Sequence, residues 1–244
     1  MAPMLDVSDE NYRQFFRLLT GRAQLWTEMV VDNQLLHARD IGRTLSGFLD
    51  FRANEHPIVC QLGGSDPARL AEAAQVVESW GYDEINLNCG CPSDKVCGRG
   101  ELGVSLMRKP ELVRDCVHAM RRRVQVPVTV KTRLGGDDSD SAAFTAAFVR
   151  TVMAGGCQHF IVHARKAWSA GLSPSENRSI PPLHYDRVAQ LCAEFPDVSF
   201  TLNGGVNSLE HVKGILNAAP QNLAGVMVGR ATSNNPCMLW DVDR

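Results

Sequence analysis

The chain has 244 residues, of which 44% are hydrophobic and 21% charged, which is ordinary for a globular protein of one large domain. No apolar run is long enough to cross a bilayer, and the first residues lack the basic start and apolar core of a signal peptide, so we expect a cytoplasmic protein, with an organelle as the alternative. The formal net charge of −2 excludes a global attraction to nucleic acid, so any contact with RNA must come from a local basic patch.

Seven short apolar runs are typical of β-strands: residues 25–31, 57–64, 84–90, 126–133, 159–165, 199–205 and 225–230. Four amphipathic stretches between them predict helices: residues 67–81, 110–123, 141–156 and 208–216. Strands that alternate with helices predict parallel βα units. A (β/α)8 barrel is typically about 250 residues long. We therefore expect a TIM barrel that spans residues 1–244 as one catalytic domain, with an open doubly wound sheet as the alternative.

Polar residues at the strand ends favour the barrel. Nearly every predicted strand finishes on a polar side chain or a glycine: Glu28, Gln61, Asn88, Lys131, His163, Asn203 and Gly229. In a barrel these ends meet at one mouth, where the active site lies. An eighth strand should come first, and residues 1–5 read as its tail, so we expect the first strand to be largely missing. Residues 236–244 read as the start of a last helix.

Two glycine motifs follow the last two predicted strands. "LNGG" would supply the backbone N–H groups of Gly204 and Gly205, and "VGR" those of Gly229 and Arg230, with the guanidinium as counter-ion. Ordinary glycine turns are the alternative. Because both motifs fall where barrels bind phosphate, we predict a phosphate site there.

Lys131 and His163 stand at two other strand ends. Lys131 could be a surface lysine, could form a Schiff base, or could balance negative charge on a reduced flavin. His163 could be a core histidine, a base, or a hydrogen-bond donor to a cofactor or phosphate. The residue types alone leave these roles open.

Four of the eight cysteines lie in apolar surroundings and are expected to be reduced thiols packed as small hydrophobes: Cys60, Cys116, Cys157 and Cys192. The spacing of Cys89, Cys91 and Cys97 lacks the paired pattern of a zinc site, so we expect no metal. What remains is one cysteine presented at the barrel mouth as an acid or a nucleophile. A thiol with a pKa near ~8.5 is a proton donor at neutral pH.

These motifs together resemble the tRNA-dihydrouridine synthase family, FMN enzymes that reduce uridine in tRNA with NADPH. The shared pattern is "APM", "TEM", "QLGG", "NLNCGCP", "VKTR", "VHAR", "NGG" and "VGR", in this order and at barrel spacing over nearly the whole chain. "NLNCGCP" followed by "GRGELGVSLM" is specific to the family. The tract "HARKAWSAGLSPSENRSIPPLHY" is similar to the branch that acts on D-loop positions 20 and 20a.

The resemblance implies a role for individual residues. Cys91 would be the catalytic acid, which protonates C5 of uracil when hydride reaches C6 from the flavin. Ten residues would hold FMN: Pro3, Met4, Gln61, Lys131, His163, Asn203, Gly204, Gly205, Gly229 and Arg230. Four others would contact the uracil or the tRNA: Asn88, Arg165, Lys166 and Arg178. The uridine would have to be extruded from the tRNA to reach the flavin.

The sequence departs from the family pattern in two respects. Ser175 stands where relatives often carry a basic residue. The C-terminal helical domain with which the family grips tRNA is expected to be absent, so we expect weak tRNA binding by these residues alone. We further expect a monomer that binds no membrane. Two alternatives are a small-molecule FMN barrel reductase of the dihydroorotate dehydrogenase type and a non-catalytic RNA-binding remnant.

Overall fold

Seven parallel strands follow one another in chain order in the computed structural model, which describes residues 1–92 and 102–243. They are β1 (Leu25–Val31), β2 (Ile58–Gly63), β3 (Glu84–Cys89), β4 (Val128–Arg133), β5 (His159–His163), β6 (Ser199–Asn203) and β7 (Leu223–Met227). Each coincides or overlaps with one of the seven predicted runs. Sequential parallel strands separated by helices are the arrangement of a (β/α) barrel, so the predicted fold class is confirmed.

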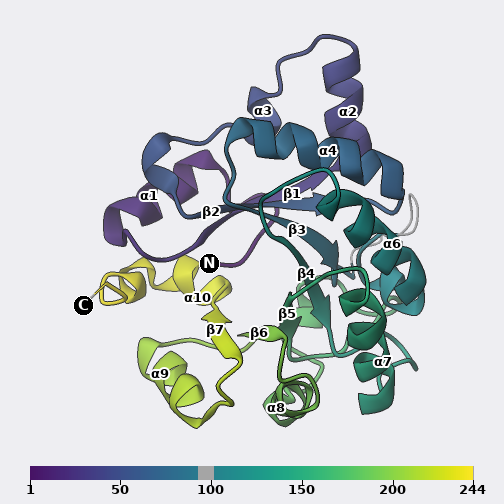
Figure 1. Cartoon of the computed structure of the whole chain (residues 1–244). Helices are drawn as coiled ribbons and strands as arrows, with labels where there is room; N and C mark the ends of the chain where they lie inside the picture. The colour runs from purple at the N-terminus through teal and green to yellow at the C-terminus, as the bar shows by residue number, and fades with distance from the viewer. Residues whose placement is uncertain (93–101, 244) are drawn as a thin grey trace.

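Helices lie around the outside of the sheet (Figure 1). They are α1 (Glu10–Leu19), α2 (Asp32–Asp40), α3 (Ser46–Leu49), α4 (Pro67–Trp80), α6 (Pro110–Arg121), α7 (Ala142–Met153), α8 (Tyr185–Glu194), α9 (Leu209–Ala218) and α10 (Arg230–Asn234). Short 3-10 turns form at Ala53–Glu55, Gly103–Arg108, Glu176–Arg178 and Pro236–Leu239. The four predicted helices are α4, α6, α7 and α9. Within the described ranges, no helix combines the length and the apolar character needed to cross a membrane.

Local sequence signals set the helix ends. α4 begins after Asp66, whose carboxylate accepts hydrogen bonds from two first-turn N–H groups, and it ends at Gly81 with a φ of 101°. Ser141 and Ser208 cap α7 and α9 through their hydroxyl groups. Asp, Ser and Gly are residue types that helix ends commonly use as caps.

The N-terminal residues lie in the seam between β7 and β1. The Ala2 N–H donates to the Val228 carbonyl at 2.8 Å, and the Met1 amino group donates to the Gln24 carbonyl at 2.7 Å. One apolar cluster inside the barrel joins this segment to four strands: Ala2, Trp26, Val59, Ile161 and Met227. Residues 1 and 2 therefore connect the first and last strands of the sheet.

The other end of the chain differs from the sequence prediction. Residues 236–239 form a 3-10 turn rather than the start of a longer helix, and α10 forms directly after the "VGR" motif, where no helix is predicted. Five residues are too few to show a helical period, so the sequence contains no signal for α10. Pro236 ends the segment because proline disfavours helical backbone in the residue before it.

Side chains of β3 alternate between the two faces of the sheet. Ile85, Leu87 and Cys89 are fully buried in the core that the helices cover, whereas Asn86 and Asn88 bond to polar side chains inside the barrel. The four cysteines predicted to be packed thiols are free and buried: Cys60, Cys116, Cys157 and Cys192. One of these thiols lies on β2, two lie on the helices α6 and α8, and one precedes β5, so all four serve packing.

A buried ion pair fixes α1 to the segment before β2. Arg13 Nε donates to Glu55 Oε2 at 2.6 Å, and neither side chain is more than 5% exposed. The other carboxylate oxygen accepts hydrogen bonds from the Arg52 N–H and the Gln14 side chain. A glutamine at position 55 would replace one carboxylate oxygen by an NH2 group. That group would face Arg13 on one side, or Arg52 and Gln14 on the other, and all of these are donors.

We expect Glu55→Gln to lower the free energy of unfolding by about 3–5 kcal/mol, because Arg13 loses its buried counter-ion. Urea unfolding followed by two independent probes measures the change. Glu72→Gln is the matched control, since its ion pair with Arg39 is exposed and its loss should change stability by about 1 kcal/mol or less. Equal losses in the two variants would contradict this reading.

Candidate active site

Four neighbouring strands bring their last residues together at the carboxyl end of the sheet. In the register of the sheet, Asn88 pairs with Lys131, Arg133 with His163, and His163 with Asn203. Residues predicted from separate motifs are therefore neighbours in space. This is the end of a barrel at which active sites lie.

Lys131 is a half-buried cation in the middle of this group. Burial, and secondly the charge of Arg133, lowers the pKa of its ammonium group to about 7, while Cys91 acts in the opposite direction. Among the described residues, no acceptor forms a hydrogen bond or an ion pair with its Nζ. A cation that is held partly out of water without a partner fits a ligand that brings an acceptor or a negative charge.

His163 is neutral in this surrounding. Burial lowers its pKa well below 6.5, and four cations add to the effect: Arg133, Lys131, Arg165 and Arg230. A neutral imidazole has one N–H donor and one acceptor nitrogen. His163 is therefore suited to hydrogen bonding with a ligand rather than to charge pairing.

The first glycine of the "NGG" motif makes room for His163. Gly204 has a φ of 115°, and a Cβ atom on it would lie 2.6 Å from His163 Cδ2. Its carbonyl accepts a hydrogen bond from the Tyr185 hydroxyl at 2.6 Å, and the Asn203 side chain donates to the Met227 carbonyl at 2.9 Å. A Cβ atom on Gly205, with a φ of 69°, would meet Leu183 at 2.3 Å. The motif therefore carries its backbone past the imidazole with no side chain in between.

The segment that carries Cys91 is held by its backbone. The N–H groups of Gly90 and Cys91 both donate to Asn88 Oδ1 at 3.0 Å, and the Gly90 carbonyl accepts from Arg133 Nε at 2.9 Å. Cys91 is partly exposed and lies within electrostatic range of Lys131, Arg133 and Arg178. Cys89 faces the opposite way, with its pKa raised well above the usual value by burial. Cys97 lies outside the described residues.

Arg133, the last residue of the "VKTR" motif, belongs to the site, although the sequence pattern predicted no role for it. Besides Gly90, its guanidinium donates to the carbonyls of Lys166 at 3.1 Å and Asn177 at 3.0 Å. Burial lowers its pKa to about 10. Arg133 thus joins the Cys91 segment to the tract after β5. The signal for it was its place two residues after Lys131, which puts both side chains on the same face of β4.

The basic residues predicted to contact tRNA (Arg165, Lys166 and Arg178) and phosphate (Arg230) lie in different surroundings. Arg165 is 8% exposed, donates to the Pro181 carbonyl, and has a buried Nε with no partner among the described residues. Arg230 donates to the Arg178 carbonyl at 2.6 Å, and its charge lowers the pKa of both Arg165 and Arg178, second to burial. Lys166 lies apart, because its ammonium pairs with Asp140 at 3.0 Å.

Three further residues predicted to contact the cofactor, Gln61, Pro3 and Met4, lie around this group of strand ends. Gln61 is 1% exposed and bonds to Asn86 and Asn88 inside the barrel. Pro3 and Met4 are half-buried beside the "VGR" turn, where a Cβ atom on Gly229 would lie 3.8 Å from Met4 Sδ. Gln61 therefore positions Asn88 from inside the barrel, whereas Pro3 and Met4 lie at the edge of the site.

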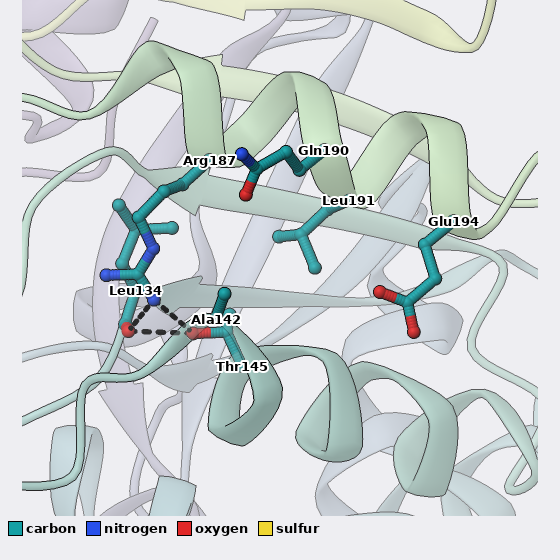
Figure 2. A pocket seen from close by; sticks show the side chains of 7 residues that line it. All are labelled: Leu134, Ala142, Thr145, Arg187, Gln190, Leu191 and Glu194. Carbon is teal, nitrogen blue, oxygen red and sulfur yellow. Dashed lines mark hydrogen bonds between the residues drawn. The ribbon is translucent and has the colours of Figure 1, made fainter.

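A small pocket between α7 and α8 is separate from the strand-end cluster (Figure 2). Arg187 crosses it and donates to the Leu134 carbonyl at 3.2 Å and to Thr145 Oγ1 at 3.0 Å. The remaining lining residues are Ala142, Gln190, Leu191 and Glu194. None of the predicted site residues lines this pocket, so we place the candidate active site at the strand ends.

The fold and the site together define a (β/α)-barrel protein with a cationic mouth and a thiol presented beside it. The sequence model of the family described as dihydrouridine synthase (Dus) matches residues 1–243. The chain belongs to this family of flavin-dependent oxidoreductases.

Individual relatives resemble the chain over its whole length. It is 51% identical to a protein of Shewanella oneidensis named tRNA-dihydrouridine(20/20a) synthase, covering 100% of this chain and 70% of that protein. A protein of Salmonella typhimurium with the same name is also 51% identical, over 100% of this chain and 70% of its own length. For a Vibrio cholerae protein of that name the identity is 49%, over 100% of this chain and 72% of that protein.

We expect Gly204→Ala to lower stability by about 1–2 kcal/mol from its left-handed backbone alone, and to displace His163. Thermal unfolding and the NMR signals of the His163 imidazole measure the two effects. Gly214→Ala is the matched control, because Gly214 lies in α9 with open space around it and alanine should stabilise the helix by up to about 1 kcal/mol. An unshifted His163 signal in Gly204→Ala would contradict the close contact.

Proposed function

We propose that the protein is a tRNA-dihydrouridine synthase that reduces D-loop uridine of the 20/20a type, with FMN as cofactor and NADPH as reductant. The observation that carries the proposal is the placement of Cys91 and Lys131 at one end of the sheet, where the Lys131 ammonium has no partner within residues 1–92 and 102–243. Relatives at about half identity over the whole chain carry this name, which supports the position specificity. We propose further that residues 1–244 act as one catalytic domain, as a monomer in the cytoplasm.

The residues at the strand ends fit FMN. Lys131 would face the acceptor atoms of the flavin ring, and neutral His163 would donate a hydrogen bond to it. The backbone of Gly204, Gly205 and Gly229, with the Arg230 guanidinium, would hold the phosphate. Pro3, Met4 and Asn203 would border the cofactor, and Gln61 would act through Asn88. The Nε of Arg165, which has no partner in the described part of the chain, is a further donor that a ligand could use.

When bound, reduced FMN supplies the hydride that adds to C6 of uracil, after oxidation of NADPH. Cys91 transfers the thiol proton to C5, so the C5=C6 double bond is reduced and one hydride and one proton are consumed. Lys131, Arg133 and Arg178 lie within electrostatic range of Cys91, and a proton from water restores the thiol for the next turnover. No metal is needed for this balance.

The RNA would approach over the same mouth. Arg178 and Arg165 would contact phosphates, and Asn88, beside the Cys91 segment, would lie under the extruded base. Lys166 is held by Asp140, so it would contribute less than the sequence pattern suggests. A base must leave its stack to reach a site at the end of a barrel.

The central experiment measures dihydrouridine in unmodified tRNA after incubation with the protein, FMN and NADPH. We expect the mass gain of two hydrogens per reduced uracil. Cys91→Ala should lower uridine reduction by roughly 10²-fold or more, the scale of a lost general acid, while NADPH still reduces the flavin. Cys89→Ala is the control and should cost far less, since Cys89 faces the helices. A folded protein that binds no FMN, or equal losses in both variants, would contradict the proposal.

Binding of FMN should take up a proton at pH 8. In the free protein Lys131 has a pKa of about 7 and is mostly neutral at that pH, whereas an anionic ligand favours the ammonium form and raises this pKa. Affinity should therefore fall as the pH rises above about 7. Calorimetry in two buffers of different ionisation enthalpy measures the uptake. Lys131→Met should abolish it, and Lys213→Met, an exposed lysine on α9, should leave it unchanged.

A further inference from the structure

Two chains of hydrogen bonds converge on one buried carboxylate, that of Glu84 at the start of β3. The longer chain crosses the barrel interior through four polar side chains in turn: Asn88, Gln61, Asn86 and Thr129. Their donor–acceptor distances, from Asn88 Nδ2–Gln61 Oε1 down to Thr129 Oγ1–Glu84 Oε1, are 2.9, 2.8, 2.9 and 2.6 Å. Each donor in this chain points toward Glu84.

The direction of the longer chain is fixed at its upper end by backbone donors. The N–H groups of Gly90 and Cys91 can only donate, and both donate to Asn88 Oδ1. The Asn88 amide therefore turns its NH2 group away from them and toward Gln61. Every link below inherits this direction, because each side chain that accepts from above must donate below.

The shorter chain is fixed in the same way from the other side. The indole N–H of Trp26 can only donate, and it donates to Gln24 Oε1 at 3.3 Å. Gln24 therefore turns its NH2 group to Glu84, where Nε2 donates to Oε2 at 3.1 Å. Glu84 thus receives a donor at each of its two oxygens, the arrangement that suits an ionised carboxylate.

We infer that Glu84 is a positioning residue for Cys91: as the common acceptor of both chains, it holds the amides of Asn86, Gln61 and Asn88 in the one direction that bonds the Cys91 segment. This inference rests on the proposed role of Cys91. Glu84 lies at the start of β3, and the Cys91 segment that it would position lies at the other end of the same strand. Glu84 acts through its neighbours and touches no reactant.

Replacement of the carboxylate by an amide shows why the charge matters. In Glu84→Gln, Gln24 still presents its NH2 group, so the new side chain turns its oxygen to Gln24 and its own NH2 to Thr129. The Thr129 hydroxyl is then free to donate upward to Asn86. The longer chain then meets donors at both ends, the N–H groups of Gly90 and Cys91 above and the new NH2 group below, and it cannot satisfy both.

A reversed chain would release the Cys91 segment. Reversal through Asn86 and Gln61 would bring a Gln61 donor to Asn88 Oδ1, and the NH2 group of Asn88 would face the N–H groups of Gly90 and Cys91. Two donors that face each other make no hydrogen bond, so both anchors of the segment would be lost. Coupled links of one network respond together rather than singly.

The ionised carboxylate is also costly for the fold, which argues against a purely structural role. Burial raises the pKa of Glu84, while the bonds from Thr129 and Gln24 act against this rise. Two other titratable groups lie near Glu84 and Gln24 among the described residues. Burial raises the pKa of the Cys157 thiol to about 12. The Met1 amino group donates to the Gln24 carbonyl, and burial lowers its pKa to about 5. Neither supplies a counter-charge at neutral pH.

The first test uses the full chain without cofactor or RNA. Side-chain amide NMR signals of Asn88 and Gln61 should shift in Glu84→Gln, although neither residue touches position 84. Asp32→Asn is the matched control: Asp32 is another buried carboxylate with a pKa raised by burial, it lies outside both chains, and its replacement should leave these signals in place. Unchanged Asn88 and Gln61 signals in Glu84→Gln would overturn the inference.

The second test asks whether the effect reaches the thiol and passes through Thr129. The rate of Cys91 alkylation by iodoacetamide, followed by peptide mass spectrometry, should change roughly twofold or more in Glu84→Gln, the lower range for coupling within one network. Thr129→Val removes the linking hydroxyl and should give a similar change, whereas Thr129→Ser keeps it and should behave like the wild type. In the double variant Glu84→Gln/Thr129→Val the two changes should not add. Equal rates in Thr129→Val and Thr129→Ser would overturn the inference.

A third measurement separates this inference from the proposed function. In the loaded enzyme, Glu84→Gln should lower uridine reduction by roughly twofold or more while NADPH-dependent flavin reduction stays unchanged. If no variant reduces uridine but the amide signals and alkylation rates respond as described, the positioning role stands and the proposed function fails. If uridine is reduced equally well in Glu84→Gln and its signals do not move, the positioning role fails and the proposed function stands.

Discussion

The alternation of side chains along a barrel strand is the constraint on which the site depends. Every second residue turns inward, and most barrels fill this space with branched apolar side chains. Here β2, β3 and β4 turn amides and a hydroxyl inward, and a buried polar group without a partner is costly. Gln61, Asn86 and Thr129 satisfy one another in sequence, so none can move independently. The position of Asn88, and with it the Cys91 segment, follows from their mutual bonding.

Charge at the mouth depends on the same framework. Arg133 has two effects. Its charge lowers the pKa of Lys131, and its guanidinium holds two loops together by donating to the carbonyls of Gly90 and Asn177. Its three bonds go to carbonyl oxygens, which occupy three of its five N–H donors without cancelling its charge. The mouth therefore keeps a positive potential while its geometry is fixed, a combination that favours an anionic ligand and leaves His163 neutral.

The strands and the residues at their ends could be predicted from the sequence, because apolar and polar side chains alternate every two residues along a strand. Inward and outward faces of β3 can be read from the alternation of Asn with Leu and Ile, and glycine pairs mark the turns after β6. Partners across the barrel could not be predicted in this way. The bond of Arg133 to Asn177, the pairing of Lys166 with Asp140, and the convergence of two chains on Glu84 join residues far apart in the chain. They depend on register and shear, which a single sequence does not encode locally.

The two cysteines around Gly90 illustrate how one turn separates packing from chemistry. Cys89 ends β3 on the outer face, and a Cβ atom on Gly90 would lie 3.2 Å from the backbone of Thr132, so a glycine lets the chain turn closely past β4. Cys91 follows with its N–H bonded to Asn88 and its carbonyl bonded to the Val104 N–H at 2.9 Å. Both of these anchors are backbone atoms. The thiol can therefore be changed without removing what holds the segment, and its contribution to proton transfer is separable from the fold.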